Sequence, residues 1–257
     1  MKEEKVIYYK DELNDEFSRG GITARTIDES YRYEGTPLRP FARGFFYHFL
    51  AKLIGFFILK IGFGHRVLGR EKLKETKGNA RFIYGNHTNP LPDAFIPTLI
   101  DFTGSTYVIV HPDNVSMPVL GRITPSLGAV PLPEGMKAYK NFTKYLDSLV
   151  KKHSSVMIYP EAHIWPYYTH IRPFKADSFH YPVKYDVPVY CFTNVYKKRL
   201  FFKKPRIETH IEGPFYPDTS LSKPERVKKL RDEVYEAMVR NSLKNEVEYI
   251  RYVKKED

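Results

Sequence analysis

One short loop of the sequence combines a histidine with a carboxylate at a spacing that suits proton transfer. Residues 85–95 read GNHTNPLPDAF and follow the apolar run RFIY. An Asp that accepts a hydrogen bond from one ring nitrogen of a His fixes the tautomer and leaves the other nitrogen free as a general base. Pro92 suits the start of a helix, which would place Asp93 in the first turn beside His87. We predict a catalytic His87–Asp93 pair, with a purely structural pair as the alternative.

Apolar β-rich runs and helical patterns alternate along most of the chain. Strands are predicted at residues 81–84, 106–110, 129–132, 155–159 and 187–192, with a further candidate at 206–211. Helices are predicted at residues 93–101, 117–127, 135–152 and 174–185, and a last one after Ser222. This alternation predicts an α/β fold with a mostly parallel central sheet flanked by helices. Active sites in such sheets form beyond the carboxyl ends of strands, where His87 is expected.

The composition limits the classes of protein to consider. Of the 257 residues, 42% are hydrophobic, which excludes a largely disordered chain. A single cysteine excludes a disulfide framework and any site built from several thiolates; Cys191 lies in an apolar run and is expected to fill the core. No spacing among the nine histidines resembles a metal site, so we expect no metal and no resident cofactor.

The net charge of +11 points to an anionic partner. Lipid head groups, phosphorylated substrates and nucleic acid all meet that description. No zinc finger, RNP motif or compact run of Lys and Arg accompanies the charge, so we do not expect nucleic acid to be a partner.

Residues 39–64 read RPFARGFFYHFLAKLIGFFILKIGFG and are far more apolar than the rest of the chain. Lys52 and Lys60 interrupt the run, and His48 lies near Lys52 on a helical wheel. We predict an amphipathic helix, or a helix pair bent at Gly55, that lies in a membrane interface with its cations at the head groups. The alternative is an amphipathic helix buried against the domain.

These patterns divide the chain into three parts. Residues 1–38 form a polar N-terminal segment without an apolar leader, residues 39–64 form the membrane-associating helix, and residues 65–257 form the α/β domain with its C-terminal helix. We therefore expect a peripheral or monotopic protein at the cytoplasmic face of a membrane with anionic lipid.

Several blocks around His87 resemble the glycerolipid acyltransferase family, whose type member is 1-acyl-sn-glycerol-3-phosphate acyltransferase. The family's first block is Asn-His, four residues and Asp, and here Asn86 and His87 precede Asp93 with five residues between. The third block, usually Phe-Pro-Glu-Gly, resembles residues 159–162 (YPEA). The resemblance runs from Val67 to Phe192 and also includes residues 67–73 (VLGREKL), 173–175 (PFK) and 187–189 (VPV).

The resemblance implies a direct transfer of a fatty acyl group from an acyl thioester to a hydroxyl of a glycerolipid acceptor such as lysophosphatidic acid, in phospholipid synthesis or remodelling. His87 would take the proton of the acceptor hydroxyl, and Asp93 would stabilise the imidazolium. Backbone N–H groups near the helix start would be donors to the oxyanion. The donor would be the thioester of acyl-carrier protein or of coenzyme A.

The resemblance also implies residues that bind the acceptor. Asn86 and Glu161 belong to the family blocks; Glu161 either bonds acceptor hydroxyls or caps nearby backbone amides. Arg172 and Lys175 are the nearest cations for a phosphate or head group, and Arg122 is a further candidate.

Two departures affect recognition of the acceptor. The family usually carries an Arg in its second and third blocks, and this chain has Pro133 and Ile164 at those places. A family member that has lost catalysis and serves as a membrane-lipid-binding or partner-binding protein is therefore the alternative function.

Overall fold

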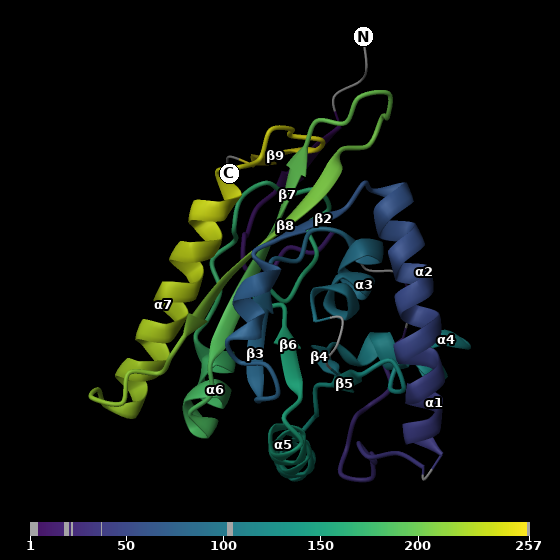
Figure 1. The fold of residues 1–257 in the computed structure, drawn as a ribbon, viewed down its shortest axis with the longest axis vertical. Helices are drawn as coiled ribbons and strands as arrows, with labels where there is room; N and C mark the ends of the chain where they lie inside the picture. Colours follow the sequence, from purple (N-terminus) through teal and green to yellow (C-terminus); the bar gives the residue numbers. More distant parts are fainter. Residues whose placement is uncertain (1–4, 18–20, 22, 37, 102–104, 256–257) are drawn as a thin grey trace.

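The computed structural model describes residues 5–17, 21, 23–36, 38–101 and 105–255. Its centre is a seven-stranded sheet in the order β2-β8-β7-β3-β6-β4-β5 (Figure 1). Every neighbouring pair is parallel except β7 and β8, so the α/β fold with a mostly parallel sheet is confirmed. The strands are β2 (Arg66–Leu68), β3 (Arg81–Gly85), β4 (Thr106–Val110), β5 (Ala129–Pro131), β6 (Ser155–Ile158), β7 (Val189–Lys197) and β8 (Arg206–Phe215).

Each face of the sheet carries its own hydrophobic cluster. Helices α5 (Met136–Lys151), α6 (His180–Tyr185) and α7 (Lys223–Ser242) contribute to the first cluster, with Phe82 and Tyr84 of β3. Helix α3 (Pro90–Ile100) and the long N-terminal helix contribute to the second cluster, with Ile83 of the same strand. Alternate residues of β3 thus enter opposite clusters, as the pleat of a strand requires, and this burial on both faces explains its continuous apolar run.

The central strand β3 leads directly to the predicted catalytic loop. It is buried along its whole length, between β6 and β7. Its last residue, Gly85, lies so close to the ring of Phe192 that a Cβ atom would approach ring atom Cζ to 2.0 Å. A glycine is therefore required where the chain leaves the sheet toward His87.

Some predicted elements change their bounds. Helix α4 covers only Leu120–Ile123, after a short 3₁₀ turn at Pro112–Val115, and the helix predicted at 174–185 begins as a 3₁₀ turn at Asp177–Phe179 before α6. Strand β7 runs five residues beyond Phe192, to Lys197. The polar residues Thr193 and Asn194 follow the apolar run on which the predicted strand rested.

A second, two-stranded sheet joins segments that are far apart in sequence. Strand β1 (Val6–Tyr9) pairs in parallel with β9 (Arg251–Lys254), and neither was predicted. Tyr252 of β9 stacks on Trp165, with ring centroids 5.0 Å apart, and the Trp165 Nε1 donates to the Asp15 carbonyl oxygen at 2.7 Å. The N-terminal segment therefore packs on the domain rather than extending from it.

The predicted membrane helix is one continuous helix from Arg39 to Gly62, seen at the right of Figure 1. It alternates α1 (Arg39–Phe45) and α2 (Lys52–Phe57) with π-helical turns at Phe46–Ala51 and Ile58–Gly62. Its length and composition would allow it to cross a membrane, although 28% of its most apolar stretch is buried in the protein.

The orientation of this helix corrects the predicted position of its cations. Arg43 and Lys52 are buried against the domain instead of facing outward. The Arg43 guanidinium donates to the Thr106 carbonyl oxygen at 3.1 Å and lies over the rings of Tyr47 and Tyr107. The outward side is mainly apolar: Phe41, Phe45, Phe49, Leu53, Ile54, Phe56, Phe57 and Ile61 are all exposed. Lys60 is exposed among them, as predicted, and so is His48.

Gly55 has a different role from the predicted bend. It is buried where α2 crosses α3, and a Cβ atom there would lie 2.9 Å from ring atom Cδ1 of Phe95. The absent side chain allows the two helices to approach closely, and this contact sets the distance of the long helix from the sheet.

We predict that Gly55→Val weakens this packing. The added methyl groups must displace Phe95, so the free energy of unfolding should fall by about 1–3 kcal/mol. Gly44→Val is the matched control, because no atom outside its own helix lies within 4 Å of a Cβ at that position. Urea unfolding followed by circular dichroism measures both; equal stability of the two variants would contradict the assigned contact.

Candidate active site

The predicted pair meets at the carboxyl end of β3. The Nδ1 atom of His87 lies 2.9 Å from Oδ2 of Asp93, which confirms the predicted contact. The Asp93 side chain is 1% exposed, whereas that of His87 is 18% exposed. The pair is thus a buried carboxylate behind a histidine ring that reaches the surface.

Backbone donors fix the direction of this hydrogen bond. The N–H groups of Thr88 and Asn89 both donate to the same Oδ2 atom of Asp93, each at 2.9 Å. A carboxylate oxygen that collects N–H donors accepts from the histidine as well, so Nδ1 of His87 carries the proton. Its Nε2 atom is left with a lone pair, as a general base requires.

Helix α3 begins earlier than predicted, and this changes the candidate oxyanion donors. Its first residue is Pro90 rather than Asp93, although Asp93 still lies in the first turn. Pro90 and Pro92 have no N–H group, and the N–H groups of Thr88 and Asn89 are taken by Asp93. The N–H groups of Thr88 and Asn89 therefore hold the Asp93 carboxylate and are not free to donate to an oxyanion.

A buried chain of hydrogen bonds continues behind Asp93. Asn194 Nδ2 donates to Asp93 Oδ1 at 3.2 Å, Thr209 Oγ1 donates to Asn194 Oδ1 at 2.7 Å, and His65 Nε2 lies 2.8 Å from Thr209 Oγ1. Because the threonine proton is given to Asn194, its oxygen accepts from His65, which fixes the Nε2–H tautomer of that ring. Sequence reasoning missed these residues, because β7 and β8 bring them to the site from distant positions.

Asn86 belongs to this buried framework and is not free to bind a substrate. Its Nδ2 donates to the Asn194 carbonyl oxygen at 3.1 Å, and its Oδ1 accepts from the Asn194 N–H at 2.7 Å. The side chain is buried and links the ends of β3 and β7. This pairing contradicts the predicted substrate-binding role.

Tyr159 supports the histidine from the side. Its ring stacks on His87 with centroids 4.2 Å apart, and its hydroxyl donates to the Asp93 carbonyl oxygen at 2.7 Å. Burial, with the nearby charge of Asp93, raises the pKa of Tyr159, so the phenol stays protonated and keeps this hydrogen bond. The Phe that is usual in this block could stack but could not bond to α3. The tyrosine was visible in the sequence, but its role depends on the fold.

Glu161 caps backbone amides, the alternative that the sequence left open. Its two carboxylate oxygens accept from the N–H groups of His87 and Arg172, each at 3.0 Å. Burial raises the pKa of Glu161, and the guanidinium of Arg172 opposes the shift. The side chain is 4% exposed, so it holds the His87 loop in place rather than meeting a substrate.

Arg172 is buried as well, and its predicted role at the acceptor phosphate is wrong. Its side chain is 1% exposed and lies over the ring of Trp165. The guanidinium donates to the carbonyl oxygens of Glu12, Glu161 and His163. Because these backbone carbonyl oxygens already accept hydrogen bonds from the buried guanidinium, the guanidinium is not available to a phosphate.

Lys175 and Arg122 are exposed, but neither contacts the His87–Asp93 pair. Lys175 follows Phe174, which packs in the cluster on the opposite face of the sheet from Tyr159. Arg122 lies on the short helix α4.

Cys191 is fully buried, and burial raises the pKa of its thiol, as expected of a core residue. Among the described residues, no three His, Cys, Asp or Glu side chains gather into a possible metal site.

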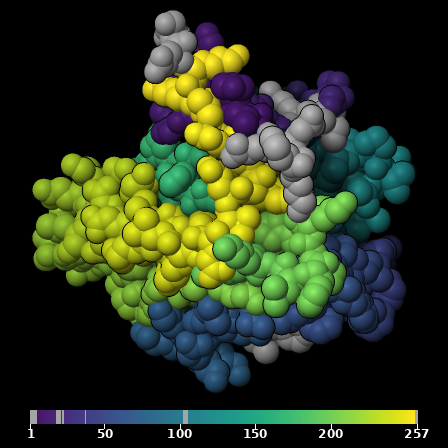
Figure 2. Space-filling view, turned by 90° about the horizontal axis from the view of Figure 1, so that it is seen from above, coloured from purple at the N-terminus to yellow at the C-terminus, as the bar shows by residue number. Residues whose placement is uncertain are grey.

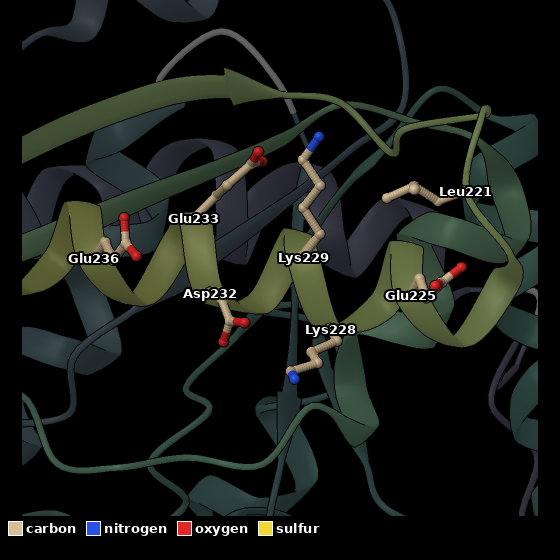
Figure 3. Close-up of a pocket in the computed structure, with 7 residues that line it drawn as sticks. All are labelled: Leu221, Glu225, Lys228, Lys229, Asp232, Glu233 and Glu236. Carbon is tan, nitrogen blue, oxygen red and sulfur yellow. The ribbon is translucent and has the colours of Figure 1, made fainter.

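A shallow hollow of about 410 Å³ lies along α7 (Figure 3). Glu225, Lys228, Lys229, Asp232 and Glu233 line it, and none of them contacts the catalytic pair. Its charges have local partners: Lys229 pairs with Asp218 at 2.7 Å, and Glu225 accepts from Ser222 in the capping box of α7. We interpret this surface as the solvated side of an amphipathic helix.

A histidine–carboxylate pair at the carboxyl edge of a mostly parallel sheet is an arrangement that can move a proton. Comparison with protein families gives a match to the model described as Acyltransferase over residues 65–194, about half of the chain. The chain therefore belongs to the acyltransferase family, as the sequence blocks indicated. A comparison with curated protein sequences gives no match.

The fold is similar to that of a solved enzyme. The crystal structure of the 1-acyl-sn-glycerophosphate (LPA) acyltransferase PlsC from Thermotoga maritima superposes with a TM-score of 0.59 and 18% sequence identity. The match covers 85% of this chain and 88% of the other.

The neutral state of His65 makes stability depend on pH. Burial, with the nearby cations Lys60 and Arg70, lowers the pKa of His65 to about 4 from 6.5. Between these values the unfolded chain binds a proton that the folded protein does not. The free energy of unfolding should therefore be highest above pH 6.5, and it should fall by about 3 kcal/mol between pH 6.5 and pH 4.

Urea unfolding at a series of pH values measures this slope. His65→Gln, which cannot titrate, should show a shallower slope, and the exposed His170→Gln is the matched control with the wild-type slope. Identical slopes for His65→Gln and the wild type would show that His65 does not titrate differently in the two states.

Proposed function

We propose that this protein is an O-acyltransferase that moves a fatty acyl group from an acyl thioester to a hydroxyl of a glycerolipid acceptor such as lysophosphatidic acid, in phospholipid synthesis or remodelling. The observation that carries the proposal is the His87–Asp93 pair, in which a buried, hydrogen-bonded carboxylate orients a histidine ring that is partly exposed. The family membership supports it independently.

The geometry suits a direct transfer in which no enzyme ester forms. Nε2 of His87 takes the proton of the acceptor hydroxyl while the oxygen attacks the thioester carbonyl carbon. The tetrahedral intermediate then expels the thiolate as the C–S bond breaks, and the imidazolium returns the proton to sulfur. The positive ring forms beside Asp93, which stabilises it without moving, because three further hydrogen bonds hold the carboxylate.

The acceptor must be recognised without the usual arginines. Pro133 and Ile164 stand at the family's Arg positions, and Arg172 is occupied inside the protein. We propose that an anionic head group meets exposed cations, for which Lys175 and Arg122 are candidates. Since Arg122 follows the exposed Val119 and Leu120 on α4, it can lie at a lipid surface with its neighbours.

We further propose that the outward apolar face of the Arg39–Gly62 helix rests in the membrane interface. An array of exposed Phe, Leu and Ile side chains on one helix is costly in water and favourable in the acyl boundary of a bilayer. The buried Arg43 and Lys52 hold the inner side of the helix on the domain. The cytoplasmic face of a membrane with anionic lipid is the proposed location, and acyl-carrier protein or acyl-coenzyme A the proposed donor.

Removal of the base tests the chemistry. His87→Ala should lower acyl transfer by roughly 10²–10⁴-fold, and His170→Ala, at an exposed histidine, is the matched control. The purified protein is incubated with membrane lipids and with labelled acyl thioesters of coenzyme A and of acyl-carrier protein, and the acylated product is identified by mass spectrometry. Full activity of His87→Ala would overturn the mechanism. An inactive wild type that still binds vesicles would instead favour the lipid-binding alternative.

Replacement of two outward side chains tests the membrane face. Phe45→Ser with Phe49→Ser removes two aromatic side chains that are more than half exposed, so vesicle affinity should fall at least about tenfold while folding is kept. The control is Met136→Ser with Leu243→Ser, at two exposed apolar residues on other helices. Sedimentation with vesicles measures both, and unchanged binding of the Phe variant would place the membrane contact elsewhere.

A further inference from the structure

The connection between β7 and β8 carries an apolar tip that the proposed chemistry does not use. Leu200, Phe201 and Phe202 are 81%, 101% and 58% exposed. Tight connections between strands usually carry Gly, Asn or Asp. Phe201 has a φ of 66°, in the left-handed region that a bulky residue disfavours. The fold thus presents a large apolar side chain to solvent in a backbone conformation that does not suit it, which indicates a function outside the folded core.

The tip is fixed to the end of the long helix. The Arg199 guanidinium donates to the carbonyl oxygens of Ile61 and Gly62, each at 2.8 Å, and lies 3.5 Å from the ring centroid of Phe202. Ile61 is the last exposed apolar residue of the helix. Figure 2 shows the green β7–β8 connection beside the blue segment of the helix end. The tip therefore continues the apolar surface of the helix.

The tip also leaves the sheet on the catalytic side. Strand β7 is parallel to β3, so its carboxyl end lies at the same edge as the end of β3, where His87 follows. A surface that the tip and the helix contact together would lie along this edge.

Positive charge surrounds the apolar tip. Residues 197–206 read KKRLFFKKPR, with six cations and no carboxylate, so the prediction that no compact run of Lys and Arg accompanies the net charge is wrong for this segment. Lys197 pairs with Glu246 and Arg206 with Glu208, while Lys198 and Lys203 are exposed. Apolar side chains encircled by Lys and Arg are complementary to a bilayer with anionic head groups, into which the apolar tip enters while the cations remain at the surface.

We propose that Leu200–Phe202 is a second membrane-inserting element, which enters the same anionic bilayer as the Arg39–Gly62 helix. A protein held in the interface by one helix alone can turn about the axis of that helix, and a second point of insertion, bonded to the helix end by Arg199, fixes that rotation. The proposal rests on the membrane association proposed above and deepens it; its own evidence is the exposed basic hairpin and the bonds of Arg199 to the helix end.

The variant Phe201→Trp tests the insertion directly. The only native tryptophan, Trp165, is fully buried, so a change in emission on vesicle binding reports the new residue. Vesicles of phosphatidylcholine with phosphatidylglycerol should shift the emission to the blue, and brominated acyl chains should quench it. Vesicles of phosphatidylcholine alone should give a weaker response. Leu200→Ser with Phe201→Ser should lower vesicle affinity about tenfold, and Met136→Ser with Leu243→Ser should leave it unchanged.

Two results would overturn the proposal. The first is an unshifted, unquenched emission from protein that has sedimented with the vesicles, since the tip would then lie in water. The second is a blue shift without vesicles that grows with protein concentration, since the tip would then contact a second copy of the chain. None of these measurements uses a substrate, so a failure of the proposed acyltransferase reaction would leave their outcome unaffected.

Discussion

The site depends on one buried charge, the carboxylate of Asp93. A buried carboxylate is tolerated only when donors surround it, and here the donors come from His87, from two backbone amides and from Asn194. Three of these donors lie on the loop after β3 and the fourth lies on β7, while Asp93 itself lies in the first turn of α3, so the carboxylate joins these three elements. The hydrogen bonds that orient the His87 ring are the same ones that close the carboxyl edge of the sheet.

The sequence was informative where structure is local. The strand, the loop and the first helical turn around His87 lie within a dozen residues, so the pairing with Asp93 could be predicted from spacing and proline chemistry. The role of Arg172 could not, because the carbonyl of Glu12 that accepts from it belongs to the distant N-terminal segment. A cation beside a family block looks the same in sequence whether solvent or backbone carbonyls surround it.

The long helix illustrates the same limit. Its apolar character was plain and Lys60 is exposed as predicted, but the positions of Arg43 and Lys52 were predicted wrongly; the acceptor for Arg43 is a backbone carbonyl at the start of β4. Buried cations hold its inner side while aromatic side chains cover its outer side, the reverse of an ordinary surface helix. The helix thus adds an exposed apolar surface to the domain while its inner side stays packed on the domain.

The pairing of β1 with β9 has a consequence for the order in which the chain matures. The α/β domain lies between the two strands in the sequence, so residues up to Lys254 must leave the ribosome before β1 and β9 can meet. Until then Tyr252 cannot cover Trp165, the ring over which the Arg172 guanidinium lies. The support behind Glu161 is therefore completed only after the α/β domain itself has been synthesised.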